Sequence, residues 1–132
     1  MIASISTFPG LWCQQVFSVE PTSLLVAPGS NVTLACLVSN MGTQAECRWQ
    51  KNGKPVGLFS GKYSLPASAT QPGDCSLTIA RVDLMLDDGE WQCQVTSSNI
   101  SYQDALASTP AILTVQGRSS CHFLHQLTLN TP

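Results

Sequence analysis

The chain has 132 residues and a net charge of -2 at pH 7, with 11% charged and 43% hydrophobic residues. One hydrophobic core is usually built from about 100 to 150 residues, so this length predicts a single domain. The 6 Lys and Arg residues are scattered along the chain, which argues against DNA, RNA or an anionic membrane as a partner. No apolar run reaches the about 18 residues that a membrane span needs, so we expect no membrane insertion.

The cysteine content indicates an oxidising compartment. The chain has 6 cysteines, a density that is ordinary for secreted proteins and unusual in the reducing cytosol. Two N-glycosylation sequons, which begin at Asn31 and Asn99, point the same way. Residues 1–15 are mildly apolar without a basic start, and we interpret them as a degenerate or truncated signal peptide or a tail. We therefore expect an extracellular protein, either secreted or the ectodomain of a plasma-membrane receptor.

Short apolar stretches separated by turn residues predict β-strands from residue 16 onward. In 32–38 four apolar side chains occupy every second position, so they share one face, which we predict to be the core face. Pro21 splits the first strand, Asn52-Gly53 is a strong hairpin signal, and Pro110 marks a kink in the last strand. In chain order the expected elements are strands at 16–19, 23–26, 32–38, 46–51, 56–59, 62–65 and 74–80, a one-turn helix or tight turn at 82–88, and strands at 89–96 and 105–115. Such a series of short strands is typical of an all-β, two-sheet sandwich.

The spacing of Cys36, Trp49 and Cys93 is that of an immunoglobulin-like antiparallel sandwich, in which a disulfide joins the facing sheets beside a tryptophan. We predict this disulfide, a core that includes Leu77, and a V/I-set domain over 16–116 followed by a disordered tail or linker at 117–132. Around the second cysteine, residues 87–93 read DDGEWQC and match the pattern D-x-G-x-Y-x-C, except that Trp91 takes the tyrosine position. A tyrosine corner uses a hydroxyl and an indole offers only an N–H, so we expect Trp91 in the core with an altered corner.

On these residues the chain is identified as a member of the immunoglobulin superfamily. Four shorter stretches resemble the first domain of the nephrin, Kirre, Roughest and Sticks-and-stones adhesion proteins. They are RWQKNG at 48–53, KYS at 62–64, LMLDDG at 84–89 and CQV at 93–95. The resemblance implies pairing between the outer face of the sheet that holds 46–51 and 89–96 and the like face of another immunoglobulin domain, with Gln94 taking part. It also implies that Asp87 pairs with Lys62 to brace one end of the sandwich.

Cys47 and Cys75 depart from the family pattern. Cys47 lies two residues before Trp49 and Cys75 two before Leu77, so strand parity turns both cysteines inward. Their strands begin at the same end of the sandwich on opposite sheets, which predicts a second disulfide between the sheets. The alternative is two buried free thiols. Cys13 and Cys121 are expected to be unpaired, or Cys13 to be removed with a signal peptide.

Strand parity also predicts the candidate binding residues. On the sheet that holds 46–51 and 89–96, the side chains expected to point out of the core are Arg48, Gln50, Gln92 and Gln94. The three amides can both donate and accept hydrogen bonds, while Leu58 or Phe59 and Tyr102 would add the apolar anchors that dominate interfaces. We therefore expect cell adhesion or receptor binding to another cell-surface protein, with an immunoglobulin-superfamily domain as the partner and a homodimer as one form of the pairing.

No catalytic site, metal or cofactor is expected. The only histidines lie in the motif Cys121-His122-x-x-His125, which has no scaffold to fix tetrahedral geometry, and Asp87 and Asp88 are explained by the fold. A glycan on Asn99 would shield the loop end of the sandwich and leave the flat face for binding. Two other functions stay open, namely a soluble immune or pattern-recognition domain that binds through loop residues 97–104, and a structural spacer of a longer receptor.

Overall fold

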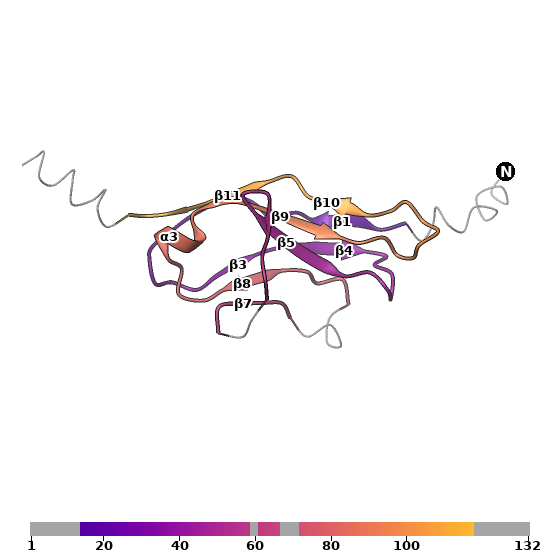
Figure 1. The fold of residues 1–132 in the computed structure, drawn as a ribbon, viewed down its shortest axis with the longest axis horizontal. Helices are drawn as coiled ribbons and strands as arrows, with labels where there is room; N and C mark the ends of the chain where they lie inside the picture. The colour runs from indigo at the N-terminus through magenta and orange to yellow at the C-terminus, as the bar shows by residue number, and fades with distance from the viewer. Residues whose placement is uncertain (1–13, 59–60, 67–71, 118–132) are drawn as a thin grey trace, which may run out of the picture.

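The structure is a computed structural model that describes residues 14–58, 61–66 and 72–117, and these residues form two facing β-layers (Figure 1). The larger sheet has the strand order β2-β11-β9-β5-β6, with β10 also paired to β9. The other layer contains β3-β8-β7 and the pair β1-β4. The elements are β1 (Val16–Val19), β2 (Leu24–Val26), β3 (Val32–Leu34), β4 (Leu37–Ser39), β5 (Cys47–Lys51), β6 (Lys54–Pro55), β7 (Tyr63–Ser64), β8 (Leu77–Ile79), α3 (Leu84–Asp87), β9 (Gly89–Val95), β10 (Leu106–Ala107) and β11 (Ala111–Val115).

The predicted core face of 32–38 is the observed one. Its alternate residues are all buried, namely Val32, Leu34, Cys36 and Val38. They pack with Trp49, Trp91 and Leu77, which are at most 2% exposed. The strand is interrupted between β3 and β4, where the Ser76 hydroxyl accepts the Cys36 N–H at 3.1 Å. A side chain thus replaces one bond of the backbone ladder without changing which face is buried.

The first strand is split at Pro21, as predicted, and its two halves lie in different sheets. β1 pairs antiparallel with β4, whereas β2 pairs in parallel with β11 in the larger sheet. Proline has no N–H for a ladder and bends the chain, so it suits the point where the strand leaves one layer for the other. Each sheet therefore receives one half of this strand.

The Asn52-Gly53 turn forms the predicted hairpin, because both residues adopt positive φ, at 51° and 80°. The predicted returning strand at 56–59 is wrong: Lys54 pairs directly with Lys51, so β6 begins immediately after the two-residue turn and covers only Lys54–Pro55. The last bond of this ladder runs from Val56 N to Trp49 O at 3.0 Å. Likewise, strand 74–80 is regular only over β8, and Asp74 makes an isolated bridge to Leu37.

Two disulfides join the layers. Cys36 and Cys93 pair with their Cα atoms 6.6 Å apart, and Cys47 pairs with Cys75 at 5.6 Å. Trp49 contacts both disulfides, because it lies opposite Cys93 in the ladder while its indole N–H donates to the Cys75 carbonyl at 2.8 Å. The two facing sheets and the two disulfides between them confirm the predicted all-β immunoglobulin-like sandwich.

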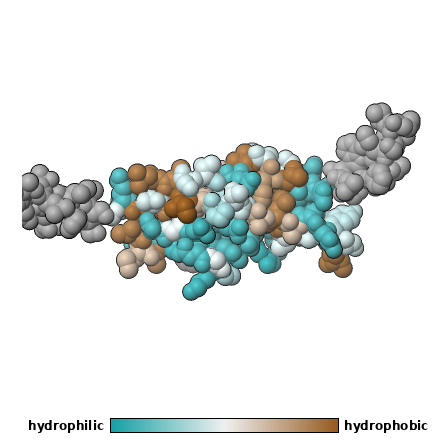
Figure 2. Space-filling view, turned by 90° about the horizontal axis from the view of Figure 1, so that it is seen from above, coloured by the Kyte–Doolittle hydropathy of each residue, from teal (hydrophilic) through white to brown (hydrophobic). Residues whose placement is uncertain are grey.

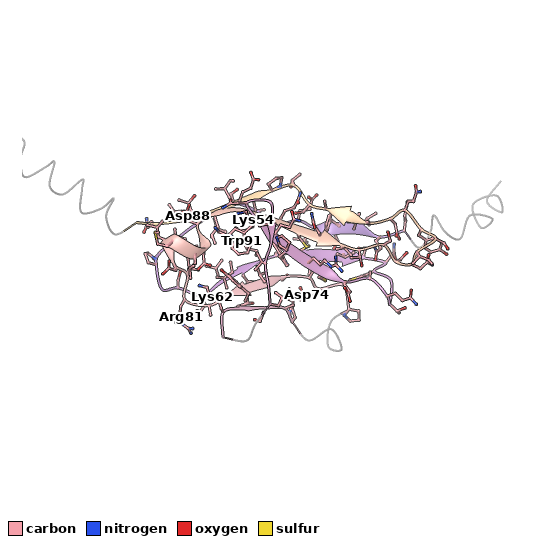
Figure 3. The ribbon with its side chains drawn as sticks, in the orientation of Figure 1. Lys54, Lys62, Asp74, Arg81, Asp88 and Trp91 are labelled. Atoms are coloured by element: carbon pink, nitrogen blue, oxygen red, sulfur yellow. A yellow bond between two sulfur atoms is a disulfide. The ribbon has the colours of Figure 1, made fainter. Side chains whose placement is uncertain are left out.

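A buried ion pair braces the end of the sandwich that carries α3. Lys62 Nζ lies 2.6 Å from Asp87 Oδ2, and the two side chains are 15% and 0% exposed. The Tyr63 hydroxyl donates to the other oxygen of Asp87 at 2.6 Å, and burial followed by this bond raises the pKa of Tyr63 well above its usual range. Figure 3 shows Lys62 on the lower side of this end and Trp91 between the layers above it.

Candidate protein-interaction face

Four polar side chains form one patch on the outer face of the larger sheet. In the β5–β9 ladder Arg48 pairs with Gln94 and Gln50 pairs with Gln92, while the intervening pair, Trp49 and Cys93, faces inward. Side chains directly opposite each other in such a ladder lie about 5 Å apart. The structure therefore brings together Arg48, Gln50, Gln92 and Gln94, which we call the glutamine face.

Two of the three amides of this face are connected by hydrogen bonds. Gln94 Nε2 donates to Gln92 Oε1 at 3.1 Å, and Gln92 Nε2 donates to the Ser108 carbonyl at 2.8 Å. Ser108 is held in turn, because its Oγ accepts the Cys93 N–H at 3.0 Å where Pro110 interrupts the last strand. This series of hydrogen bonds ends at Gln94, whose Oε1 accepts no hydrogen bond from any described residue. An oriented acceptor thus lies on a face made of neutral amides and one arginine.

Two shallow hollows flank Arg48. The first, of about 340 Å³, has a lining that includes Arg48, Gln94 and Thr96 together with Leu106 and Ala107 of β10. The second, of about 500 Å³, lies on the loop side, and its lining includes Glu46, Arg48, Thr96, Asn99 and Ile100. Arg48 also contacts Glu46 at 3.2 Å, but both side chains are more than 60% exposed, so this pair adds little stability. Arg48 therefore borders both hollows.

The loop beside the glutamine face is held by a residue that the sequence did not single out. Gln15 is 1% exposed, and its Nε2 donates to the Thr96 and Asp104 carbonyls at 3.0 Å each. Its Oε1 accepts the Gly42 N–H at 3.0 Å, so one buried amide joins the start of the chain, the β4–β5 loop and the β9–β10 loop. The N-terminal boundary at residue 16 stays a prediction, but hydrogen bonding to the sandwich already includes Gln15.

Asp104 fixes the β9–β10 loop from within. Its carboxylate accepts the Ser98 hydroxyl at 2.7 Å and the Ser98 N–H at 2.9 Å. These two bonds, the side-chain bond foremost, lower the pKa of Asp104 below its ordinary value of 3.8. Gly42 packs against the same serine so closely that a Cβ there would lie 2.5 Å from Ser98 Cβ. The loop is therefore a fixed structure.

The role of the predicted apolar anchors stays a prediction. Leu58 is 47% exposed and Tyr102 is 42% exposed, but neither lines a hollow beside Arg48, and Phe59 lies outside the described residues. Exposed apolar side chains occur instead at α3, where Met85 is 86% exposed, and at the fully exposed Ile100. Seen from above, apolar surface gathers toward both ends of the molecule with polar surface between them (Figure 2).

Across residues 14–58, 61–66 and 72–117, no cluster of three His, Cys, Asp or Glu side chains is arranged to hold a metal ion. The same part of the chain contains no helix long and apolar enough to cross a membrane. Cys13 and the Cys121-His122-x-x-His125 motif lie outside it.

The fold, the two disulfides and the sequence together define the class of protein. The chain matches the family model of the immunoglobulin domain over residues 15–97. It belongs to the immunoglobulin domain family.

Among members of this family, the chain is similar to Roughest and Kirre, as its short motifs predicted. It is 38% identical over 106 residues to the Irregular chiasm C-roughest protein of Drosophila melanogaster, an alignment that covers 76% of this chain and 13% of that protein. It also resembles the solved structure of Rst D1-D2, at 37% identity and a TM-score of 0.66, over 77% of this chain and 49% of the other. For Duf (Kirre) D1 the identity is 34% and the TM-score 0.67, over 77% and 96% of the two chains.

Proposed function

We propose that this domain is an extracellular recognition module that binds another cell-surface protein through the glutamine face. The observation that carries the proposal is the series of hydrogen bonds from Gln94 through Gln92 to Ser108, which holds the Gln94 amide while its oxygen accepts no bond from a described residue. A polar side chain that is oriented before binding loses less conformational freedom when a partner bonds to it. The extracellular setting is supported by two disulfides between the sheets.

The chemistry of the face suits another protein domain. Its three amides can donate and accept at once, so they can pair with a like face without bringing equal charges together. The hollow beside Gln94, which Leu106 and Ala107 of β10 help to line, can receive an apolar side chain of the partner. The resemblance to the Roughest and Kirre domains implies an immunoglobulin domain as that partner, in a homodimer or a mixed pair.

The test uses the 132-residue chain in two assays: the secreted form is tested for binding, and the form displayed on cells is tested for cell aggregation. Gln94→Arg places a charge in the ladder position opposite Arg48 and should abolish binding to immunoglobulin-superfamily ectodomains and to itself. Thr78→Arg is the matched control, because it puts the same side chain on the other sheet, where Thr78 pairs with Thr33. Full binding by Gln94→Arg, with measurable binding by the parent chain, would refute the role of this face.

A second function is favoured by the fixed β9–β10 loop, which presents the fully exposed Ile100 and the 42% exposed Tyr102. Such a loop, preorganised by Gln15 and Asp104, suits a domain that binds by its loops. Ile100→Asp should then abolish binding while Gln94→Arg leaves it intact. If neither variant changes the binding of the longer receptor, the domain acts as a spacer.

A further inference from the structure

The sequon in the β9–β10 loop has the geometry of a modification site. Asn99 Oδ1 accepts the N–H of Ser101 at 2.7 Å and that of Tyr102 at 3.1 Å. Its Nδ2 donates to no described residue, so a sugar attached to this nitrogen would break no hydrogen bond seen in the structure. The neighbouring Ile100 is fully exposed, which leaves the turn open to a glycosylating enzyme.

Asn99 also lies beside the glutamine face. It lines the hollow of about 500 Å³ that Arg48 and Glu46 line from the sheet side. An oligosaccharide is bulky and hydrophilic, so one attached at this rim would occupy the space above the hollow. The loop cannot easily carry the sugar elsewhere, because the Asp104 and Gln15 bonds hold both of its ends.

We propose that Asn99 carries an N-linked oligosaccharide that covers the hollow beside Arg48 and limits access to that end of the glutamine face. The co-reactant is an oligosaccharide on a polyprenyl diphosphate. The bond between the sugar C1 and the diphosphate oxygen breaks, a bond between C1 and Asn99 Nδ2 forms, and the nitrogen loses a proton as the polyprenyl diphosphate leaves. The modification itself rests on the proposed extracellular setting.

The second sequon gives a matched comparison within the molecule. Asn31 Oδ1 accepts the Arg81 N–H at 2.9 Å, and its Nδ2 is also without a described partner. Figure 3 places Arg81 near the end of the sandwich that carries α3, away from the β9–β10 loop. A glycan on Asn31 should therefore leave the hollow beside Arg48 open.

Occupancy is tested on the full chain secreted from animal cells behind a cleavable signal peptide. Treatment with peptide N-glycosidase in oxygen-18 water converts each glycosylated asparagine into a labelled aspartate that peptide mass spectrometry detects. We expect label at residue 99 in the parent chain and in Thr33→Ala, and none in Ser101→Ala. A secreted chain with Asn99 unlabelled would overturn the proposal.

Shielding of the hollow beside Arg48 by the Asn99 glycan is tested without a binding partner. A negative result is then distinct from a failure of the proposed function. An arginine-selective dicarbonyl reagent should modify Arg48 severalfold more slowly in the glycosylated chain than in the same chain after enzymatic removal of its glycans. The rate at Arg81 should stay constant in Thr33→Ala, which cannot carry a glycan on the neighbouring Asn31. Thr33→Ala should keep this protection and Ser101→Ala should lose it. Because the enzyme acts on folded protein, the comparison does not depend on the variants folding. Equal rates of Arg48 modification before and after glycan removal would overturn the proposal that the glycan shields this hollow, even if the glutamine face binds as proposed.

Discussion

The indole N–H of Trp91 donates a 2.9 Å hydrogen bond to the backbone carbonyl of Asp87, four residues earlier. In a tyrosine corner a hydroxyl two residues before the second cysteine bonds to the backbone a few residues upstream. Trp91 occupies that position before Cys93 and is fully buried. The corner is thus altered in chemistry, as expected, but its hydrogen bond is retained by a different donor.

Trp91→Phe should lower the free energy of unfolding by about 1 to 3 kcal/mol through the unpaired Asp87 carbonyl alone, with a further loss from the cavity that the smaller ring leaves. Trp91→Tyr restores a donor at the same position, so it should lose less than the phenylalanine variant. Urea unfolding with the disulfides intact measures both. Equal losses would show that the hydrogen bond adds nothing beyond packing.

The ion pair between Lys62 and Asp87, beside this corner, predicts a second effect on stability. Lys62→Met should cost about 3 kcal/mol, because removing one partner of a buried pair leaves the other charge uncompensated. The Asp87 carboxylate is fully buried and would keep only its bonds from Tyr63 and the Asp83 N–H. The double variant with Asp87→Asn removes the charge as well, so it should be more stable than the sum of the two single losses predicts. Additive losses in this double-mutant cycle would contradict a coupled pair.

The larger features of the fold were predictable because they depend on local patterns. Side chains alternate along a strand, so the apolar residues of 32–38 indicated the core face, and the same parity turned Cys47 and Cys75 toward each other. The four residues of the glutamine face followed from that alternation as well. The position of β6 was mispredicted at 56–59, because the two-residue turn pairs Lys54 directly with Lys51 and so starts the returning strand earlier.

The polar network that supports the face was not predictable. The partners of Gln15, at Thr96 and Asp104, lie 81 and 89 residues away, and nothing local marks a glutamine as buried. Ser108 likewise looks like an ordinary turn residue, although its hydroxyl replaces a backbone bond to Cys93. Such roles depend on which backbone groups the fold leaves without a partner, and this is known only once the sheets are assembled.

The second disulfide should stabilise the domain by an amount that grows with the logarithm of the length of chain that it closes. Cys47 and Cys75 are 28 residues apart, and in the chain-entropy model a loop of that size gives about 3.5 kcal/mol. The double variant Cys47→Ala/Cys75→Ala should keep its β-sheet circular dichroism, since Cys36–Cys93 remains, but should melt at a lower temperature. An unchanged melting temperature would contradict a stabilising bond.

The β9–β10 loop should respond to acid. Asp104 has a lowered pKa in the folded domain, so the folded state binds its proton less tightly than the unfolded state does. Its contribution is therefore fully present above the unfolded value of about 3.8 and is lost as the pH falls through the lower folded value. Melting curves between pH 5 and about pH 2.5 should show a steeper loss for the parent chain than for Asp104→Asn. Parallel curves would mean that the Ser98 bonds do not favour the charged form.

The orientation of Gln94 should depend on Gln92. Gln92→Ala removes the acceptor of the Gln94 amide and the bond to Ser108, so we expect weaker binding through the glutamine face. The cost in unfolding free energy should stay at about 1 kcal/mol, because neither amide is fully buried and water can replace the lost bonds. Nuclear magnetic resonance of the Gln94 side-chain amide gives a direct readout, since its protons should exchange faster with water in the variant. Gln50→Ala is the control: it removes a neighbouring amide but not the acceptor of Gln94, so the exchange rate should stay at the parent value. Unchanged exchange in Gln92→Ala would show that Gln94 is not positioned by its neighbour.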